Sequence, residues 1–385
     1  MFPNRQGSLA LDFAASEATE TMPAKVSPCA YNAISLYCGA GGLDLGFSRA
    51  GFGIHWSIDS DPFAVKTYNT NLEPCAVCGD VLSIDPPSSP QPTLVIGGPP
   101  CQGFSVIGRM DPDDPRSQHV DHFFDVVARL DPRAFVMENV KALAASPRWA
   151  DVRERLLERA TALGYARSLI VLNAQDFGVP QSRERMFLIG MRGATPERPL
   201  ATTAGCPPSV RSALQKLPPF GDPGNDASCA ARVVPAGKPV MRPTAHRGSL
   251  LFNGSGRPLK LDGPAKTLPA SMGGNATPII DQEELELGAE PWVIGYHRRL
   301  QSGKPPLKRA PSRLRRITVQ EAAALQTFPA NWKFVGPRVA QYRQVGNAVP
   351  PRLAEAVALS VRSVLEHQDD AIRRSDTTIE LLQAA

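Results

Sequence analysis

The stretch of this sequence that most constrains its fold is 94–108, LVIGGPPCQGFSVIG. Its first three residues are apolar, which is typical of a short buried strand in a parallel sheet. Two glycines and two prolines end this strand at once, because glycine adopts backbone conformations closed to other residues and proline fixes φ. Cys101 follows this rigid turn, and we interpret it as a nucleophile. A small buried thiol is the commoner fate of cysteine, but the polar residues Gln102 and Ser105 argue against it.

Strand-like apolar runs alternate with helical patterns as far as Gly190. The expected strands are 33–37, 54–58, 94–96, 134–137, 168–172 and 187–189. Apolar residues at helical spacing predict helices over 43–50, 120–130 and 353–364, and a further helix that begins at Ser146 as N-cap and ends before Gly164. This alternation predicts an α/β fold with a doubly wound, mostly parallel sheet. Such sheets bind their ligands at the carboxyl ends of the strands.

A glycine turn after the first expected strand indicates a nucleotide-type cofactor site. Residues 38–42, CGAGG, join this strand to a helix, and Asp59 ends the next strand about 20 residues later, where a carboxylate can bind both hydroxyls of a ribose. These two features leave NAD and S-adenosylmethionine equally open. Asp80 favours S-adenosylmethionine, because it could hold an adenine amino group and the turn lacks the full spacing that serves a pyrophosphate. Loop capping is the alternative role for Asp59 and Asp80.

Regular periodicity ends at about Met191, where Pro, Gly and Arg become frequent and helical patterns disappear. We therefore expect a catalytic and cofactor domain at 31–192 and a smaller irregular target-recognition domain at 193–314. Residues 315–368 would return the chain to the first domain, and 1–30 and 369–385 are expected to be tails.

One segment of the irregular region has charges of a single sign. Residues 291–316 contain no acidic side chain, whereas eight are basic: Arg298, Arg299, Lys304, Lys308, Arg309, Arg313, Arg315 and Arg316. This pattern indicates contacts with phosphates. Residues that read bases are expected upstream of it, with Arg242, His246, Arg247 and Asn253 as candidates.

Composition excludes several other classes of protein. No apolar run approaches the roughly 18 residues that span a membrane, and the N-terminus does not have the pattern of a signal peptide. The seven cysteines show no framework of spacings, which suits reduced thiols in a cytoplasm. Cys75 and Cys78 form a single CxxC pair without a second pair, so we expect no metal site. The net charge of +5 is weak support for nucleic-acid binding by itself.

The sequence resembles the cytosine-C5 DNA methyltransferases over roughly residues 33–365, because it carries the motifs of that family in the family's order. They are Tyr37-x-Gly-x-Gly-Gly42, Pro100-Cys101-Gln102, Glu138-Asn139-Val140, Gln181-Ser-Arg-Glu-Arg185, Pro264-Ala-Lys-Thr-Leu268 followed by Gly273 and Gly274, Arg315-Arg-Ile-Thr318 with Leu325-Gln326-x-Phe328-Pro329, and Gln344-Val-Gly-Asn-Ala-Val-Pro-Pro351.

The resemblance implies the fold of S-adenosylmethionine-dependent methyltransferases and methyl transfer to C5 of cytosine within a specific double-stranded DNA sequence. Cys101 would attack C6 of a flipped-out base, and Glu138 would act as an acid or hydrogen-bond partner at N3 of that base. Arg183 and Arg185 would supply cations near O2 and the thiolate. S-adenosyl-L-methionine would leave as S-adenosyl-L-homocysteine. The cofactor would contact Tyr37, Gly39, Gly41, Gly42, Asp59, Asp80, Val81, Pro100, Asn347 and Val349. The DNA would contact Gln102, Ser105, Thr267, Arg298, Arg299 and Arg315.

The resemblance further implies a monomer in a bacterial cytoplasm, paired in function with a restriction endonuclease. The sequence departs from the family at Ser35, where an acidic residue is frequent, and at His119, where a leucine contacts the cofactor. A tRNA methyltransferase of the same fold is an alternative, but its Cys-Phe-Thr signature is absent. A non-catalytic DNA-binding relative is disfavoured because the four expected catalytic residues are present. An NAD dehydrogenase is a distant third reading.

Overall fold

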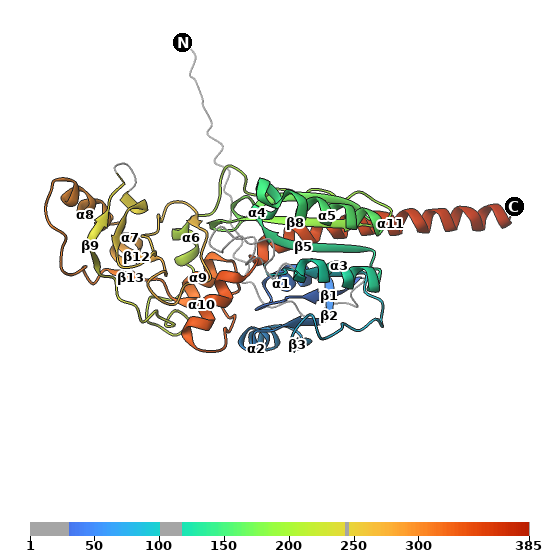
Figure 1. Cartoon of the computed structure of the whole chain (residues 1–385), viewed down its shortest axis with the longest axis horizontal. Coiled ribbons are helices and arrows are strands. Elements are labelled where there is room, and N and C mark those ends of the chain that lie inside the picture. Colours follow the sequence, from blue (N-terminus) through green and yellow to red (C-terminus); the bar gives the residue numbers. More distant parts are fainter. Residues whose placement is uncertain (1–30, 101–117, 243–245, 385) are drawn as a thin grey trace, which may run out of the picture.

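The computed structural model of the protein describes residues 31–100, 118–242 and 246–384. It is elongated, with a large sheet at one end and a smaller domain at the other (Figure 1). The sheet has seven strands in the order β3-β2-β1-β4-β5-β8-β6. These strands are β1 (Tyr31–Leu36), β2 (Phe52–Asp59), β3 (Ala76–Cys78), β4 (Leu94–Gly97), β5 (Ala134–Val140), β6 (Ala166–Asn173) and β8 (Glu184–Met191).

Neighbouring strands from β3 to β5 are parallel, whereas β8 runs antiparallel to both β5 and β6. The predicted doubly wound, mostly parallel α/β fold is therefore confirmed. The reversal of β8 was not predicted. It follows from the short link after β6, which holds only the 3-10 helix η3 (Ala174–Phe177) and the two-residue strand β7 (Gln181–Ser182) and has no crossover helix.

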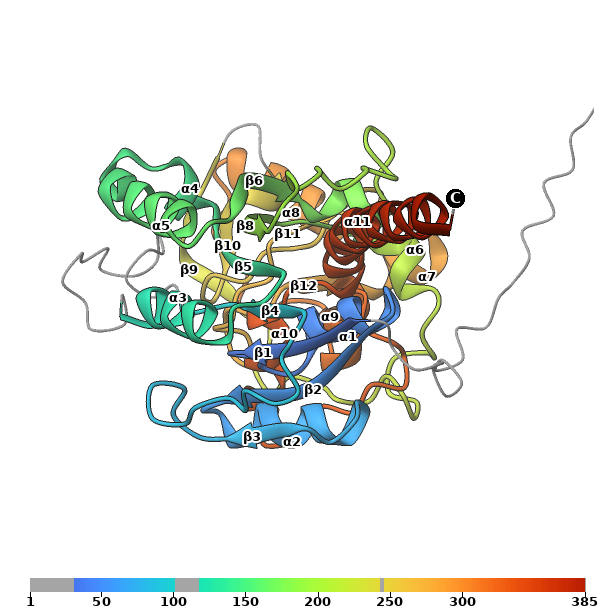
Figure 2. The ribbon, with the colours of Figure 1, turned by 90° about the vertical axis from the view of Figure 1, so that its right-hand side faces the viewer.

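Helices cover both faces of the sheet (Figure 2). One face is covered by α3 (Gln118–Leu130), α4 (Lys141–Ala145) and α5 (Ala150–Ala162), and the other by α1 (Gly42–Arg49) and α11 (Pro351–Ala384), while α2 (Pro62–Asn71) packs beside β2 and β3. Successive side chains of a strand point to opposite faces, so Ala33 lies in the core under α1 and α11 and Ile34 in the core under α3. Gly46 of α1 allows close packing, because a Cβ there would lie 2.4 Å from that of Ala354.

Two predicted helix ends differ from the structure. Ser146 makes no capping hydrogen bond, because the 3-10 helix η2 (Pro147–Trp149) follows it and α5 begins only at Ala150. Gly164 does lie just past the end of α5, with a φ of 82°. At the C-terminus, α11 runs to Ala384, so the stretch predicted as a tail from residue 369 continues this helix away from the sheet (Figure 1).

The smaller domain consists of short elements, as its irregular sequence predicts. They are α6 (Val210–Leu214), β9 (Pro235–Val240), the 3-10 helix η4 (His246–Gly248), β10 (Leu250–Phe252), β11 (Ala265–Lys266), β12 (Ile279–Asp281), α7 (Gln282–Leu287), α8 (Trp292–Gln301), β13 (Leu314–Arg316), α9 (Val319–Leu325) and α10 (Arg338–Asn347). The expectation that helices disappear after residue 191 was wrong for α8, which buries Val293, Tyr296 and His297 on one face. Within the described residues, no helix is both long and apolar enough to cross a membrane.

A buried carboxyl group lies under the glycine turn. Asp44 of α1 is completely buried, and its Oδ1 accepts a hydrogen bond of 3.1 Å from the Tyr68 hydroxyl, while Oδ2 has no partner among the described residues. Burial raises the pKa of Asp44 to about 7. The folded protein therefore binds this proton more tightly than the unfolded chain does. Protonation of Asp44 therefore stabilises the folded state at low pH, and this contribution is lost as the pH rises through 7.

We expect Asp44→Asn to flatten the pH dependence of stability. For the wild-type protein, this one group should lower the free energy of unfolding by about 1.4 kcal/mol between pH 6 and pH 8, and the asparagine cannot titrate. Urea unfolding at both pH values measures the difference, with the exposed Asp85→Asn as the control. Parallel pH profiles of the wild-type protein and Asp44→Asn would contradict the raised pKa.

Candidate active site

The glycine turn lies at the carboxyl end of β1, next to the end of β4, where the direction of winding of the sheet changes. Its backbone is left-handed at Gly39 and Gly41, with φ of 55° and 85°. A Cβ at Gly39 would meet no atom within 4 Å, so open space adjoins the turn there. A Cβ at Gly42 would lie 2.4 Å from the carbonyl oxygen of Val349. The motif at 344–351 therefore does return to the glycine turn.

Both predicted cofactor carboxylates bind backbone amides. Asp59 accepts hydrogen bonds from the amides of Gly39 (2.9 Å) and Asp61 (2.8 Å), and burial raises its pKa. Asp80 accepts one from the amide of Leu82 (3.0 Å) and is exposed, and this bond is the main reason that its pKa is lowered. Both aspartates thus cap loops, the alternative considered from the sequence. Each carboxylate oxygen has a second lone pair, so ribose or adenine contacts stay compatible with this capping.

Glu138 and Arg185 form an ion pair at the adjoining ends of β5 and β8. The Arg185 Nε lies 3.0 Å from the Glu138 Oε1, and both side chains are largely buried, at 15% and 12% exposed. Burial raises the pKa of Glu138, while the charges of Arg185 and Arg183 oppose this rise. The antiparallel pairing of β8 with β5 brings these two motifs together. Glu138 can therefore hold a proton at a higher pH than an exposed carboxyl group.

The same motif contacts the turn that leads to Cys101. The Asn139 side-chain amide donates a hydrogen bond of 3.2 Å to the carbonyl oxygen of Pro99, and the Glu138 Oε2 lies 3.2 Å from where a Cβ of Gly98 would be. The half-buried Pro100 ends this part of the described chain, whereas Cys101, Gln102 and Ser105 lie outside the described residues. Val81, three residues after the end of β3, is buried.

The structure revises the role expected for Arg183. This side chain is only 1% exposed, and its guanidinium donates to the carbonyl oxygens of Leu268 (3.2 Å) and Gly346 (2.9 Å), with a longer bond of 3.5 Å to that of Asn347. It joins two distant segments to the sheet, so we describe it as a positioning residue and no longer as a contact to the base. The three carbonyl groups occupy its donors, but its charge still acts at a distance, because it opposes the rise in the pKa of Glu138.

Gln181 makes a similar connection that the sequence analysis missed. Its amide donates to the Gln326 side chain (2.9 Å) and accepts from the amide of Leu268 (2.9 Å), and all of these groups are buried. The signal was present in the sequence, because Gln181 and Gln326 both belong to motifs that the family shares. Thr267, which follows β11, is exposed and donates 2.9 Å to the carbonyl oxygen of Ser182, so it lies close to this network.

Arg315 does not fit the predicted contact with DNA. Both of its terminal nitrogens bind the carboxylate of Glu321 at 2.8 and 2.6 Å, its Nε binds Gln282, and its guanidinium lies over the Phe220 ring. Thr318 and Glu321 also form a capping box that starts α9, which the Thr-x-x-Glu spacing would have predicted. We therefore correct this prediction: Arg315 supports α9.

Residues 291–316 contain no acidic side chain, but in the structure acidic side chains from the preceding residues lie beside them. Arg313 pairs with Asp281 at 2.6 Å, Arg298 pairs with Glu290 at 3.5 Å, and Arg316 donates to the carbonyl oxygen of Thr277. These partners precede the segment and fold beside it. Its exposed basic side chains without an ion pair among the described residues are Lys304, Lys308 and Arg309. Arg299 is half-buried and donates to the carbonyl oxygen of Pro305.

Two of the four candidates for base contacts are also held within the domain. Arg247 pairs with Glu284 at 2.6 Å, and the Asn253 side chain binds the amide of Val234, the carbonyl oxygen of Arg232, the Asn275 side chain and the Arg316 guanidinium. Arg242 is exposed. The side chain of His246 lies outside the described part of the chain.

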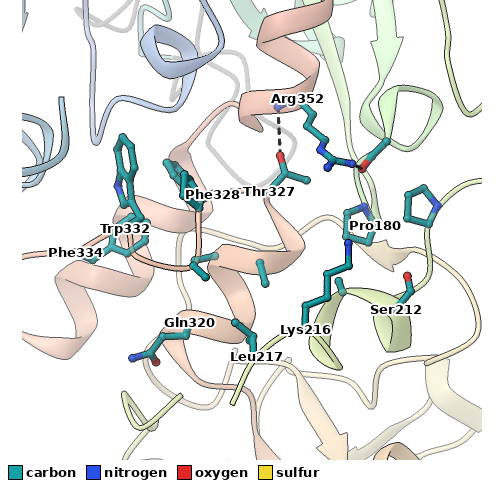
Figure 3. A pocket seen from close by; sticks show the side chains of 17 residues that line it. Pro180, Ser212, Lys216, Leu217, Gln320, Thr327, Phe328, Trp332, Phe334 and Arg352 are labelled. Atoms are coloured by element: carbon teal, nitrogen blue, oxygen red, sulfur yellow. Dashed lines mark hydrogen bonds between the residues drawn. The ribbon is translucent and has the colours of Figure 1, made fainter. Parts of the chain in front are cut away.

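A cavity of about 190 Å³ lies between α6, α9 and the start of α11 (Figure 3). It is lined by the side chains of Lys216, Phe328 and Trp332, among others, and at its edge the Arg352 amide donates to the Thr327 hydroxyl at 3.2 Å. Phe328 also packs toward the glycine turn, because its ring lies 3.2 Å from where a Cβ of Gly42 would be. The cavity thus lies behind the turn and outside the cluster of predicted catalytic residues. No group of three metal-binding side chains occurs among the described residues.

A doubly wound sheet with a glycine turn, two loop-end carboxylates and a glutamate–arginine pair at one edge is typical of the α/β enzymes that bind a nucleotide-like cofactor. The model of the C-5 cytosine-specific DNA methylase family matches residues 31–225 and 271–363 of this chain. The chain therefore belongs to this family, and it is a DNA methyltransferase. Membership implies the use of a methyl donor.

Its relatives include named type II methyltransferases. The chain is 33% identical over 349 residues to M1.HphI of Haemophilus parahaemolyticus, with 85% of this chain and 86% of that protein covered. It is 32% identical over 351 residues to M.NgoPII of Neisseria gonorrhoeae, with 88% and 98% covered.

Solved structures share the fold at lower identity. The S. pombe Dnmt2 methyltransferase has a TM-score of 0.61 at 19% identity and covers 87% of this chain and 99% of its own. The Entamoeba histolytica methyltransferase EhMeth has a TM-score of 0.63 at 16% identity and covers 87% and 98%. The fold extends over both the sheet and the smaller domain.

We expect Asp59→Ala to weaken the binding of S-adenosylhomocysteine more than the binding of DNA. Loss of a carboxylate that holds ribose hydroxyls should cost on the order of 1.5–3 kcal/mol. Calorimetry measures the affinity, and Asp59→Asn serves as the matched variant because it keeps one acceptor for the amides of the turn. An unchanged affinity in Asp59→Ala would leave Asp59 with the role of loop capping alone.

Proposed function

We propose that the protein transfers a methyl group from S-adenosyl-L-methionine to C5 of cytosine within a specific double-stranded DNA sequence. The observation that supports this most is the buried Glu138–Arg185 pair beside the turn that leads to Cys101. A thiol, a carboxyl group that can share a proton with N3 and a cation are the groups that this chemistry requires.

The residues at the glycine turn fit S-adenosylmethionine. Open space adjoins Gly39, the first amides of α1 can receive a carboxylate, and the Asp59 and Asp80 oxygens can accept hydrogen bonds from hydroxyl and amino groups. Tyr37, Val81, Pro100, Asn347 and Val349 complete the proposed pocket. When bound, the cofactor supplies an electrophilic methyl group on a sulfonium.

The chemistry of the base falls to Cys101, Glu138 and Arg185. The Cys101 thiolate adds to C6 of cytosine, and Glu138 shares its proton with N3, so that negative charge does not build up on the ring. The electron pair reaches C5, which takes the methyl group. Water is the proposed base that takes the proton from C5. The electrons of that C–H bond then re-form the C5–C6 double bond and expel the Cys101 thiolate. Arg185, held by Glu138, provides the cation that favours the thiolate and the charge at O2.

The target atom lies inside the base stack, so the base must be flipped out at a cost of a few kcal/mol. A second domain that grips the duplex offsets this cost. The proposed contacts with DNA are the exposed Thr267 and Arg298 and the half-buried Arg299 of the smaller domain, together with Gln102 and Ser105. By likeness to the type II relatives, the protein would protect the DNA of a bacterial host against a restriction endonuclease, as a monomer in the cytoplasm.

Transfer of tritiated methyl groups to duplex DNA tests the function, and bisulfite sequencing identifies the cytosine. Duplexes with 5-fluorocytosine at that position should trap the enzyme in a band on a denaturing gel, and only with cofactor, because fluorine cannot leave as a cation. Labelling of DNA without this band would refute covalent attack at C6. Absence of any labelling, on DNA of random sequence, would refute the function itself.

We further propose that specificity resides between about Gly193 and Ser312. The family model leaves residues 226–270 unmatched, within this segment, and Arg242 is exposed there. Replacing 193–312 with the matching region of a relative should change the methylated sequence and leave the cofactor affinity within about twofold, because the glycine turn lies outside the exchange. Bisulfite sequencing and calorimetry measure the two effects. An active chimera with the original site would contradict this assignment.

A further inference from the structure

His119 stands where the resemblance leads us to expect leucine, and it contacts Tyr37. It lies in the first turn of α3, and its Nδ1 and its carbonyl oxygen are each 3.2 Å from the Tyr37 hydroxyl oxygen. The two rings also meet edge to face, with centroids 5.4 Å apart and an interplanar angle of 85°. Tyr37 follows β1 directly and precedes the glycine turn, so this contact joins the turn to α3.

The hydrogen bonds of this pair can be assigned by counting protons. The carbonyl oxygen of His119 can only accept, so the single hydroxyl proton of Tyr37 goes to it. The Nδ1 atom then completes the contact by donating its proton to a lone pair of the hydroxyl oxygen. The neutral form of His119 that fits carries its proton on Nδ1. A leucine at this position offers neither the ring donor nor the edge-to-face contact.

The backbone of Tyr37 explains why its ring needs this support. Its φ is 58°, in the left-handed region that aromatic residues rarely adopt. Such a conformation costs free energy and persists only where the surroundings hold it. Burial raises the pKa of Tyr37 well above its usual range, and the Asp80 charge adds to this rise, so the hydroxyl keeps its proton. Tyr37 is therefore a permanent donor.

We propose that His119 is a positioning residue for the cofactor: through the Tyr37 hydroxyl it fixes the Tyr37 ring, which the proposed function places against the cofactor. This inference rests on the proposed function, which places S-adenosylmethionine against the glycine turn. Tyr37 and the His119 ring would act as one unit, because the His119 Nδ1 reaches the cofactor site only through the Tyr37 hydroxyl.

A double-mutant cycle with Tyr37→Phe and His119→Leu tests the coupling. Calorimetry with S-adenosylhomocysteine should give roughly three- to tenfold weaker binding for each single variant. The double variant should bind no more weakly than the weaker of the two. His119→Asn should restore most of the affinity, because its side-chain amide can donate from a position close to that of Nδ1. Exposed His367→Leu on α11 is the control and should bind as the wild-type protein does.

Three results would overturn the proposal: wild-type affinity in His119→Leu, additive losses in the double variant, or equal losses in His119→Leu and His119→Asn. Thermal unfolding of each variant without ligand separates a general loss of stability from a loss confined to binding. If the wild-type protein itself binds neither S-adenosylmethionine nor S-adenosylhomocysteine, the proposed function fails first, and the two failures are distinguishable.

Discussion

Replacing Cys101 with alanine is expected to abolish methyl transfer and to leave the affinity for S-adenosylhomocysteine unchanged. The thiolate is the only group proposed to add to C6, and without it C5 of cytosine is too weak a nucleophile to take the methyl group. The rate should fall at least roughly ten-thousand-fold, as on removal of other enzyme nucleophiles. Tritium transfer and calorimetry measure the two properties on the same preparation.

A matched variant separates this effect from general damage to a thiol protein. Cys206 is exposed and has no role in the proposed chemistry, so Cys206→Ala should keep wild-type activity. The alanine variant at position 101 should also form no band with 5-fluorocytosine duplexes. Appreciable turnover by Cys101→Ala would reject the covalent mechanism, since no second thiol is proposed near the base.

Replacing Glu138 with glutamine is expected to lower kcat by roughly 100- to 10,000-fold, the usual contribution of a general acid. Glutamine fills the same space and can donate a hydrogen bond to N3, but it cannot transfer a proton. It also leaves the buried Arg185 without its carboxylate partner, which sits 3.0 Å away in the wild-type protein. Single-turnover measurements isolate the chemical step from product release.

The reaction rate is also expected to change with pH in a definite direction. Burial raises the pKa of Glu138, so its protonated form persists to a higher pH than in an exposed glutamate and is lost as the pH rises through that pKa. The wild-type rate should therefore fall on the alkaline side, and the glutamine variant should lack this fall. The exposed Glu158→Gln on α5 should behave as the wild-type protein does. A Glu138→Gln enzyme with the wild-type rate and profile would exclude general acid catalysis here.

The sequence predicts the sheet and the meeting of its motifs well, for a simple physical reason. Carboxyl ends of parallel strands share one edge, so the residues after β1, β4 and β5 must lie close together wherever the strands pair. The direction of β8 was not predictable in this way, because an apolar run of residues does not indicate which way its strand runs in the sheet. It is nevertheless β8 that carries Arg185 to Glu138.

Charge partners were the least predictable feature. Arg315 and Arg313 read as phosphate contacts because no acid lies near them in the sequence, yet Glu321 and Asp281 meet them in space. Only folding brings these pairs together, and a buried arginine is indistinguishable from an exposed one in a one-dimensional pattern. The left-handed backbone of Tyr37 was also not predictable, because no pattern in the neighbouring sequence indicates it.

The contacts of Gly42 with Val349 and of Gly46 with Ala354 have a consequence for synthesis of the chain. The first helix after the glycine turn packs against α11, which the ribosome adds last. While the smaller domain is being made, one face of the sheet is therefore covered by α1 alone, and the apolar residues that α11 covers in the finished protein are exposed. Such long-range closure is slow and favours aggregation of incomplete chains. A nascent chain released before residue 351 would lack α11. Chaperones and proteases would therefore recognise the exposed sheet until the whole polypeptide is complete.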